Sequence, residues 1–410
     1  MEPMRLEQMF LEAIRQIIGD DRAAHFAADV GDFSALMTLA GAQKLLPVVI
    51  EAVHELPTAK EWPEFASYKR AAQVQVMQQT KRTAEFLVVY EKLREAGIRA
   101  LVVKGSVCRS VWPKGDLRLS ADEDLYIRPE EFEKACAVLR ECGLACSEKA
   151  DLDKDFEIGW RRPSSTLYIE LHQKLFAPDS EAVCDLQMFF DGAFARATEY
   201  SVDHGQAKVW SLSPEDHLLY LILHAYKHFI HSGFGIRQVC DIGLWAKHYG
   251  KEVNHNSFIR NLTKAHALHF AAAVFAIAKE DLGIEPQLPE SLTELPIDRK
   301  PMLRDLLDAG VYGSSSRSRL HSAPMTVEAV AASRRDRKKR SLIHRAFPSR
   351  RELLADYPEL EVHSLRLPLV WAKRLAKYRS ETKNIADNSL SGSIRISNER
   401  EALLRRYKII

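Results

Sequence analysis

The sequence has no pair of cysteines with the Cys-x-x-Cys spacing that is typical of zinc ribbons and redox motifs. Its six cysteines are scattered over 410 residues. In a chain of this length, such scattered thiols are typical of reduced core residues rather than of a disulfide framework. We therefore expect six free thiols and a cytoplasmic location.

The chain also lacks a run of about 18 uninterrupted apolar residues, so we expect no membrane-spanning helix. The first twenty residues carry acids within an apolar pattern that recurs at helical spacing. They also have no small-residue cleavage site. This segment is predicted to be an amphipathic helix rather than a signal peptide.

Neither sign of charge is in large excess, because 58 Lys and Arg face 56 Asp and Glu and leave a net charge of +2. A dedicated duplex-DNA coat protein normally has a large positive excess, so this balance argues against one. With 18 Gly and 17 Pro, the sequence is too poor in both residues for a fibrous protein. The length instead predicts two to three globular domains of about 150 residues each.

Four regions follow from the pattern along the chain. Residues 1–97 show helical periodicity, residues 98–211 mix short apolar runs with one helix, residues 212–380 are mostly helical again, and residues 381–410 form a polar tail. We thus predict an α+β protein in which a small mixed β-sheet is flanked by N-terminal and C-terminal helical regions.

The mixed region contains four predicted strands. Each is a short apolar or alternating run bounded by turn residues: Ile98–Val103, Asp124–Ile127, Phe156–Trp160 and Thr166–His172. The last two are separated by a short segment with a proline, as in a hairpin. A helix is predicted from Pro129 to Gly143, and Ser213 is predicted to cap the next helix. Residues 282–300 are Pro-rich and residues 313–316 read Gly-Ser-Ser-Ser, so both are predicted loops.

Two carboxylates mark the start of the second predicted strand. Asp122 and Asp124 are two residues apart, so they converge on one face while Glu123 points away. Convergent carboxylates bind hard divalent cations such as Mg²⁺. In a later strand, Glu170 and His172 also share a face. Three acids on neighbouring strands can hold two cations for phosphoryl or nucleotidyl transfer.

The turn after the first strand, Gly105-Ser106, can offer backbone N–H groups to a phosphate. Lys104-Gly105-Ser106, then Arg118-x-x-x-Asp122-x-Asp124, then a strand ending in Glu-Leu-His, resembles the polymerase-β-like nucleotidyltransferase superfamily. It is most similar to the bacterial "nucleotidyltransferase family proteins". Further matching segments are SPEDHLLYLILHAYKH, GIRQVCDIGLW, AFPSRRELLADYP, LRLPLVWAKRL and ISNEREALLRRY.

The resemblance implies roles for individual residues. Asp122 and Asp124 match the paired metal ligands, and Glu170 matches the third carboxylate, which binds metal or deprotonates the attacking hydroxyl. Gly105 and Ser106 match the turn that holds the nucleoside triphosphate, with Lys104 and Arg118 on its phosphates. The implied cofactor is Mg²⁺, with two ions allowed. The implied substrate is an NTP, with ATP as the expected donor. A small molecule, a protein side chain or an RNA end all fit as the acceptor.

Other features leave alternatives open. Four histidines of the predicted helix after Ser213 lie on one stripe: His217, His224, His228 and His231. We expect His224 and His228 to face the nucleotide, although with Asp241 they could instead form a metal-dependent phosphohydrolase site. The basic run 334–340 is predicted to be a solvated helix face or an RNA-binding surface. A non-catalytic nucleotide-binding or regulatory module would use the same cleft.

Overall fold

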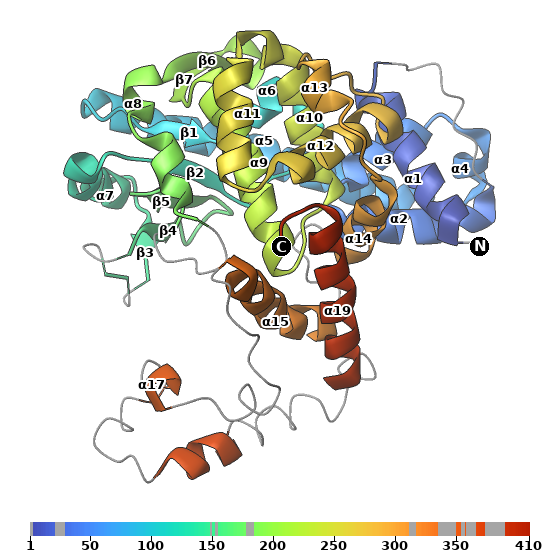
Figure 1. Ribbon diagram of the computed structural model, residues 1–410. Helices are drawn as coiled ribbons and strands as arrows, with labels where there is room; N and C mark the ends of the chain where they lie inside the picture. Colours follow the sequence, from blue (N-terminus) through green and yellow to red (C-terminus); the bar gives the residue numbers. More distant parts are fainter. Residues whose placement is uncertain are drawn as a thin grey trace.

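The computed structural model describes residues 3–20, 29–147, 150–151, 155–177, 184–310, 317–334, 350–353, 357, 366–373 and 390–410. The N-terminal region is helical, as predicted. Its helices are α1 (Pro3–Ile18), α2 (Phe33–Ala42), α3 (Leu46–Val53), α4 (Pro57–Glu61) and α5 (Phe65–Glu95). Helix α5 ends at Gly97, whose φ of +76° suits a helix C-terminus. Helices α1–α4 lie at the end of the molecule opposite β3 and β4 (Figure 1).

The central sheet has five strands in the order β1-β2-β5-β4-β3. They are β1 (Leu101–Val103), β2 (Glu123–Tyr126), β3 (Ala145–Cys146), β4 (Glu157–Arg161) and β5 (Tyr168–His172). Strand β2 runs parallel to β5 and antiparallel to β1, and β4 runs antiparallel to both β3 and β5. The predicted small mixed sheet and its hairpin are therefore confirmed.

Short helices connect these strands. Helix α6 (Gly105–Ser110) follows β1 directly, and α7 (Phe132–Glu141) occupies the predicted position before Gly143. The sequence analysis missed β3, which has only two residues. It also missed a second sheet made of β6 (Thr198–Val202) and β7 (Ala207–Ser211). Strand β7 joins the central sheet through Ser211, whose hydroxyl donates to the carbonyl of Val102 at 2.6 Å.

The C-terminal region is a set of helices that packs over the sheet. It comprises α8 (Ala193–Arg196), α9 (Pro214–His231), α10 (Ile236–Tyr249), α11 (His255–Lys264), α12 (Leu268–Ala276), α13 (Glu290–Thr293) and α14 (Lys300–Ala309). A π-helical turn, Ile277–Asp281, extends α12. Ser213 caps α9 as predicted, because its hydroxyl accepts the Asp216 N–H at 3.2 Å. The predicted loop 282–300 holds the short helix α13.

The segment that we set apart as a polar tail forms helix α19 (Leu390–Arg406), which packs along α15 (Arg317–Arg334) (Figure 1). Two large side chains explain its docking. Arg400 is 2% exposed and pairs with Asp305, and Tyr407 is fully buried. The short helix α17 (Arg350–Leu353) belongs to a small separate apolar cluster with Val370. The predicted loop 313–316 and residues 335–340 of the basic run lie outside the described residues.

One continuous apolar core includes residues of α1, β1, α9 and the C-terminal Ile409. The four predicted regions share this core, so their boundaries remain a prediction. All six cysteines are free thiols, as expected. In the described part of the chain, no helix has the length and apolar character needed to cross a membrane.

Candidate active site

The turn between β1 and α6 has an unusual backbone. Lys104 has φ +59° and ψ −124°, a conformation that costs a non-glycine residue free energy and persists only where its surroundings hold it. Its N–H donates to Nε2 of the buried His217 at 3.2 Å. Gly105 follows with φ +32°, and a Cβ at this position would come within 2.1 Å of Glu123 Oε2. Only glycine therefore allows Glu123 to lie against the turn.

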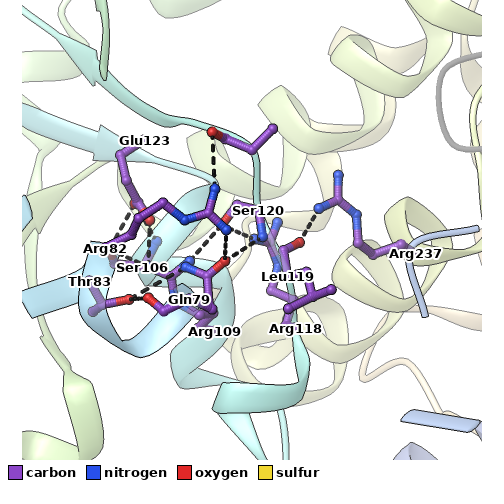
Figure 2. A network of polar contacts seen from close by, with 11 residues as sticks. Gln79, Arg82, Thr83, Ser106, Arg109, Arg118, Leu119, Ser120, Glu123 and Arg237 are labelled. Carbon is purple, nitrogen blue, oxygen red and sulfur yellow. Dashed lines mark hydrogen bonds and ion pairs between the residues drawn. The ribbon is translucent and has the colours of Figure 1, made fainter. Parts of the chain in front are cut away.

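A buried polar network holds the turn from behind (Figure 2). Glu123 Oε2 accepts the Ser106 N–H at 2.9 Å and the Ser106 hydroxyl at 2.8 Å, and Glu123 also pairs with Arg109. Arg109 reaches the hydroxyl of Ser120 at 2.6 Å. Glu123 thus points away from the Asp122–Asp124 face, as predicted. Both donors of Ser106 are used within the protein, whereas we expected them to hold a phosphate.

The acids of the central strands meet on the opposite face of the sheet. Asp124 of β2 stands directly opposite Glu170 of the parallel strand β5. His172 joins them, with Nε2 3.1 Å from Asp124 Oδ1 and 3.8 Å from Glu170 Oε2. In the part of the chain that the structure describes, these three side chains form a group whose ligand atoms all lie within 4.8 Å of one another. Such a group can hold a metal ion.

Lys104 compensates the charge of this group. Its ammonium lies 3.1 Å from Asp124 Oδ2 and 3.3 Å from His224 Nε2. Burial alone would raise the pKa of Asp124, but Lys104 and His172 outweigh it and lower this pKa to about 2. Burial works in the opposite direction on Lys104, whose pKa is nevertheless held above its ordinary value by Asp124 and the neighbouring acids. Asp124 and Lys104 therefore form a charged pair at neutral pH.

For Glu170 and Asp122, burial and the neighbouring carboxylates outweigh the nearby cations. Burial, together with the charges of Asp124 and Asp122, raises the pKa of Glu170 to about 8. Burial and Asp124 also raise the pKa of Asp122. An excess of carboxylates in a partly buried position is unfavourable without a cation. The electrostatics of this group therefore favour the binding of a positive ion.

These residues line a cavity of about 310 Å³ between the sheet and helices α9 and α10. Most of the predicted site residues contribute to its wall: Lys104, Gly105, Arg118, Asp122, Glu170, His224 and His228. Ser106 lines a different cavity behind the turn. Burial and nearby lysines lower the pKa of His228 to about 3 and also hold that of His224 well below its ordinary value, so both rings are neutral at physiological pH. The cavity thus combines neutral donors or acceptors, cations and acids.

Comparison with protein-family models gives a match over residues 29–283 to a family described as "Uncharacterised nucleotidyltransferase". The match covers more than half of the chain. The chain belongs to this nucleotidyltransferase family. Comparisons with curated proteins and with solved structures give no match. The resemblance found in the sequence is thereby confirmed, and with it an enzyme of the nucleotidyl transfer class.

The contact predicted for Arg118 differs in the structure, and so does the environment of Asp241. Arg118 was expected on a phosphate, yet it forms a buried bidentate pair with Asp241, with both distances at 2.8 Å. Asp241 also accepts the indole N–H of Trp112 at 2.9 Å. Because these groups hold Asp241, it does not belong to the described metal-ligating group. This disfavours the phosphohydrolase alternative built on His224, His228 and Asp241.

Sequence reasoning missed several residues of the site. Glu157 lines the cavity and stands opposite His172 in the β4–β5 ladder. The predicted hairpin placed the two strand ends that contain residues 157 and 172 close together, but its predicted bounds did not give the exact register of this pair. His217 and Arg109 support the turn from positions far along the chain or on the hidden face of α6. The histidine stripe already contained His217 but did not indicate its contact with the turn, and no local pattern marks Arg109.

Proposed function

We propose that this nucleotidyltransferase binds an NTP together with a divalent cation and transfers the NMP group to a hydroxyl-bearing acceptor. ATP is the proposed donor and Mg²⁺ the expected ion. One observation supports this most strongly. Asp124 and Glu170 converge beside Lys104, which lies on a strained turn. Glu170 and Lys104 line the adjoining cavity of about 310 Å³, and Asp124 is buried directly behind them. Transfer enzymes of this kind work mostly by positioning and charge neutralisation.

The chain's own groups have distinct roles in this proposal. Asp122, Asp124 and Glu170 hold the cation, which neutralises charge that develops on the phosphates. Lys104 contacts the triphosphate near the Gly105 turn, and His224 and His228 contact the nucleotide from α9. The acceptor oxygen bonds to the α-phosphorus, the bond from that phosphorus to the bridging oxygen of the β-phosphate breaks, and pyrophosphate leaves. Glu170 takes the proton of the acceptor hydroxyl when it acts as the base.

The remaining two predicted contacts need a rearrangement. Arg118 would have to leave Asp241, and Ser106 would have to leave Glu123, before either could bind a phosphate. Lys227 and Arg237 also line the cavity and offer cations without breaking the Arg118–Asp241 pair. We therefore propose that Lys227 and Arg237 contribute to triphosphate binding alongside Lys104.

Release of pyrophosphate tests this proposal. Purified protein is incubated with Mg²⁺, each of the four NTPs and candidate acceptors, and the acceptor is examined for the mass of an added NMP. Asp124→Asn should lower the rate by two orders of magnitude or more, because it removes a charged contact that positions the cation. Asp29→Asn is the matched control, since Asp29 is exposed on the N-terminal region. Equal rates in all three proteins would contradict the proposed role of Asp124.

The nature of the acceptor is a separate question with its own measurement. Adduct mass distinguishes a small molecule, a protein side chain and an RNA end directly. RNA binding should in addition weaken steeply with salt, because it depends on phosphate contacts. Binding of RNA without metal-dependent transfer would favour a binding module over an RNA-modifying enzyme.

A further inference from the structure

We propose that His172 is a direct ligand of the divalent cation through Nε2, and that the site consequently prefers Mn²⁺ to Mg²⁺. The inference rests on the proposed function only in requiring that a cation binds at this group. The proposed reaction stays the same, and only the preferred ion differs.

The imidazole nitrogen occupies a ligand position among the carboxylates. Its Nε2 lies 3.1 Å from Asp124 Oδ1 and 3.8 Å from Glu170 Oε2. Neighbouring ligands of an octahedral ion with bonds of about 2.1 Å are about 3 Å apart. Asp124 and His172 therefore already have the separation of adjacent ligands, and a small movement of Glu170 would complete the set. His172 is 5% exposed, so the ring has little freedom to turn away.

The second ring nitrogen of His172 would gain a hydrogen-bond partner if the first nitrogen bound a metal ion. Nδ1 is buried and makes no hydrogen bond with the residues that the structure describes, while Glu157 Oε2 lies 3.6 Å away. When Nε2 carries the ring hydrogen and donates it to Asp124, Nδ1 is an acceptor. It then faces the carboxylate of Glu157, which is also an acceptor, so the two form no hydrogen bond. When Nε2 binds a metal, the hydrogen moves to Nδ1 and can be donated to Glu157. Metal-bound histidines commonly donate in this way to a carboxylate.

A purely electrostatic role for His172 explains less of the structure. Asp124 already has the Lys104 ammonium at 3.1 Å, so it does not require a second cation. The Nδ1 atom of His172 would also keep no hydrogen-bond partner among the described residues in that role. The ligand role uses both nitrogens and accounts for the position of Glu157. The geometry therefore favours coordination.

One imidazole nitrogen among carboxylate groups forms a donor set that distinguishes between ions. Mg²⁺ binds oxygen ligands and retains water rather than imidazole. First-row transition ions bind imidazole increasingly well along their series, and Mn²⁺ begins that series while still accepting an oxygen-rich octahedral set. Replacement of one oxygen ligand by imidazole should therefore favour Mn²⁺ over Mg²⁺ by about tenfold in dissociation constant.

Pulsed electron paramagnetic resonance of the full-length protein loaded with Mn²⁺ tests coordination directly. A bound imidazole nitrogen gives a ¹⁴N hyperfine coupling that water and carboxylates do not give. The wild type should show this coupling and His172→Gln should lose it. His224→Gln and His231→Gln are matched controls on α9 and should retain it. Titration calorimetry with Mn²⁺ alone and Mg²⁺ alone should show the preference in the wild type and its loss in His172→Gln.

The outcomes separate this inference from the proposed function. Mn²⁺ binding without ¹⁴N coupling, or coupling that His224→Gln abolishes, would overturn the role of His172 and leave the carboxylate site intact. Equal affinity for the two ions would overturn the preference. Glu157→Gln provides a second variant if His172→Gln fails to fold. It should keep the coupling and weaken Mn²⁺ binding by about tenfold, as loss of an outer hydrogen-bond partner does. Failure of the wild type to bind either ion would instead contradict the proposed function.

Discussion

At the scale of single residues, several side chains of the site hold a neighbour in a backbone conformation or charge state that is unfavourable for that residue alone. Lys104 keeps its positive φ because His217 accepts its N–H, and the same lysine keeps Asp124 charged. The paired aspartates were predictable from their spacing. The partners of Ser106 and Arg118 were not, because Glu123 and Asp241 lie 17 and 123 residues away in the sequence. Residue spacing predicts which side chains share a face of a strand. It does not predict which hydrogen-bond donors are already paired within the protein.

His217 should make the protein sensitive to acid. Burial lowers the pKa of His217 to about 3, below its ordinary value near 6.5. A depressed histidine pKa contributes stability that is complete above pH 6.5 and is lost as the pH falls towards 3. At pH 4.5, two pH units below the unfolded value, the loss should be about 2–3 kcal/mol.

Urea unfolding at pH 7 and pH 4.5 measures this effect. His217→Gln retains an acceptor for Lys104 but does not titrate, so its stability should fall by about 2–3 kcal/mol less than that of the wild type over this range. The difference between the two pH values is the readout, because the variant also loses ring contact with Trp245. An identical loss in both proteins would show that His217 does not titrate in this way.

At the scale of elements, the site depends on how two strands and one turn are placed. The compact apolar strands and the hairpin were predictable, because their patterns are short, apolar and bounded by turn residues. Strands β6 and β7 were missed, since each is a short, largely polar run and β7 is fixed by contacts with β1 and α5 that lie far away in the sequence. The turn at Gly105-Ser106 was predictable from the sequence. That Gly105 leaves room for the side chain of Glu123 became visible only in the structure.

The turn predicts a difference between two glycines. Gly105→Ala should force Glu123 to move and break its bonds to Ser106 and Arg109, at a cost of about 3 kcal/mol or more. Gly97→Ala is the matched control. Gly97 also has positive φ, but nothing lies within 4 Å of an added Cβ, so the cost should be about 1 kcal/mol. Chemical denaturation of both variants measures the difference, and equal costs would contradict the close approach of Glu123.

At the scale of the whole molecule, the chain's last helix closes onto the helix that lines the site. Arg319 of α15 and Arg400 of α19 share the carboxylate of Asp305, and Arg400 also donates to the Phe229 carbonyl of α9. The polar composition of residues 381–410 suggested a separate tail. Polar patterning could not reveal docking that depends on a buried arginine and a distant aspartate.

Docking of α19 predicts unequal effects of two arginines. Arg400→Met retains an apolar stem but leaves the Phe229 carbonyl without this donor, so it should destabilise the protein by about 2–4 kcal/mol. Arg406→Met removes an exposed pair with Asp298 and should cost less than about 1 kcal/mol. Thermal unfolding of both variants measures this. Similar small effects would mean that α19 does not support the body.

The central claim is that the acids facing the cavity bind a nucleoside triphosphate through a divalent cation. Titration calorimetry of ATP, with and without Mg²⁺ and repeated with Mn²⁺, tests it most directly on the wild type, Asp124→Asn and Glu170→Gln. Cation-dependent binding should occur in the wild type, weaken at least tenfold in Asp124→Asn, and largely persist in Glu170→Gln, if Glu170 is the base. Binding of equal strength in all three proteins without a cation would contradict the account.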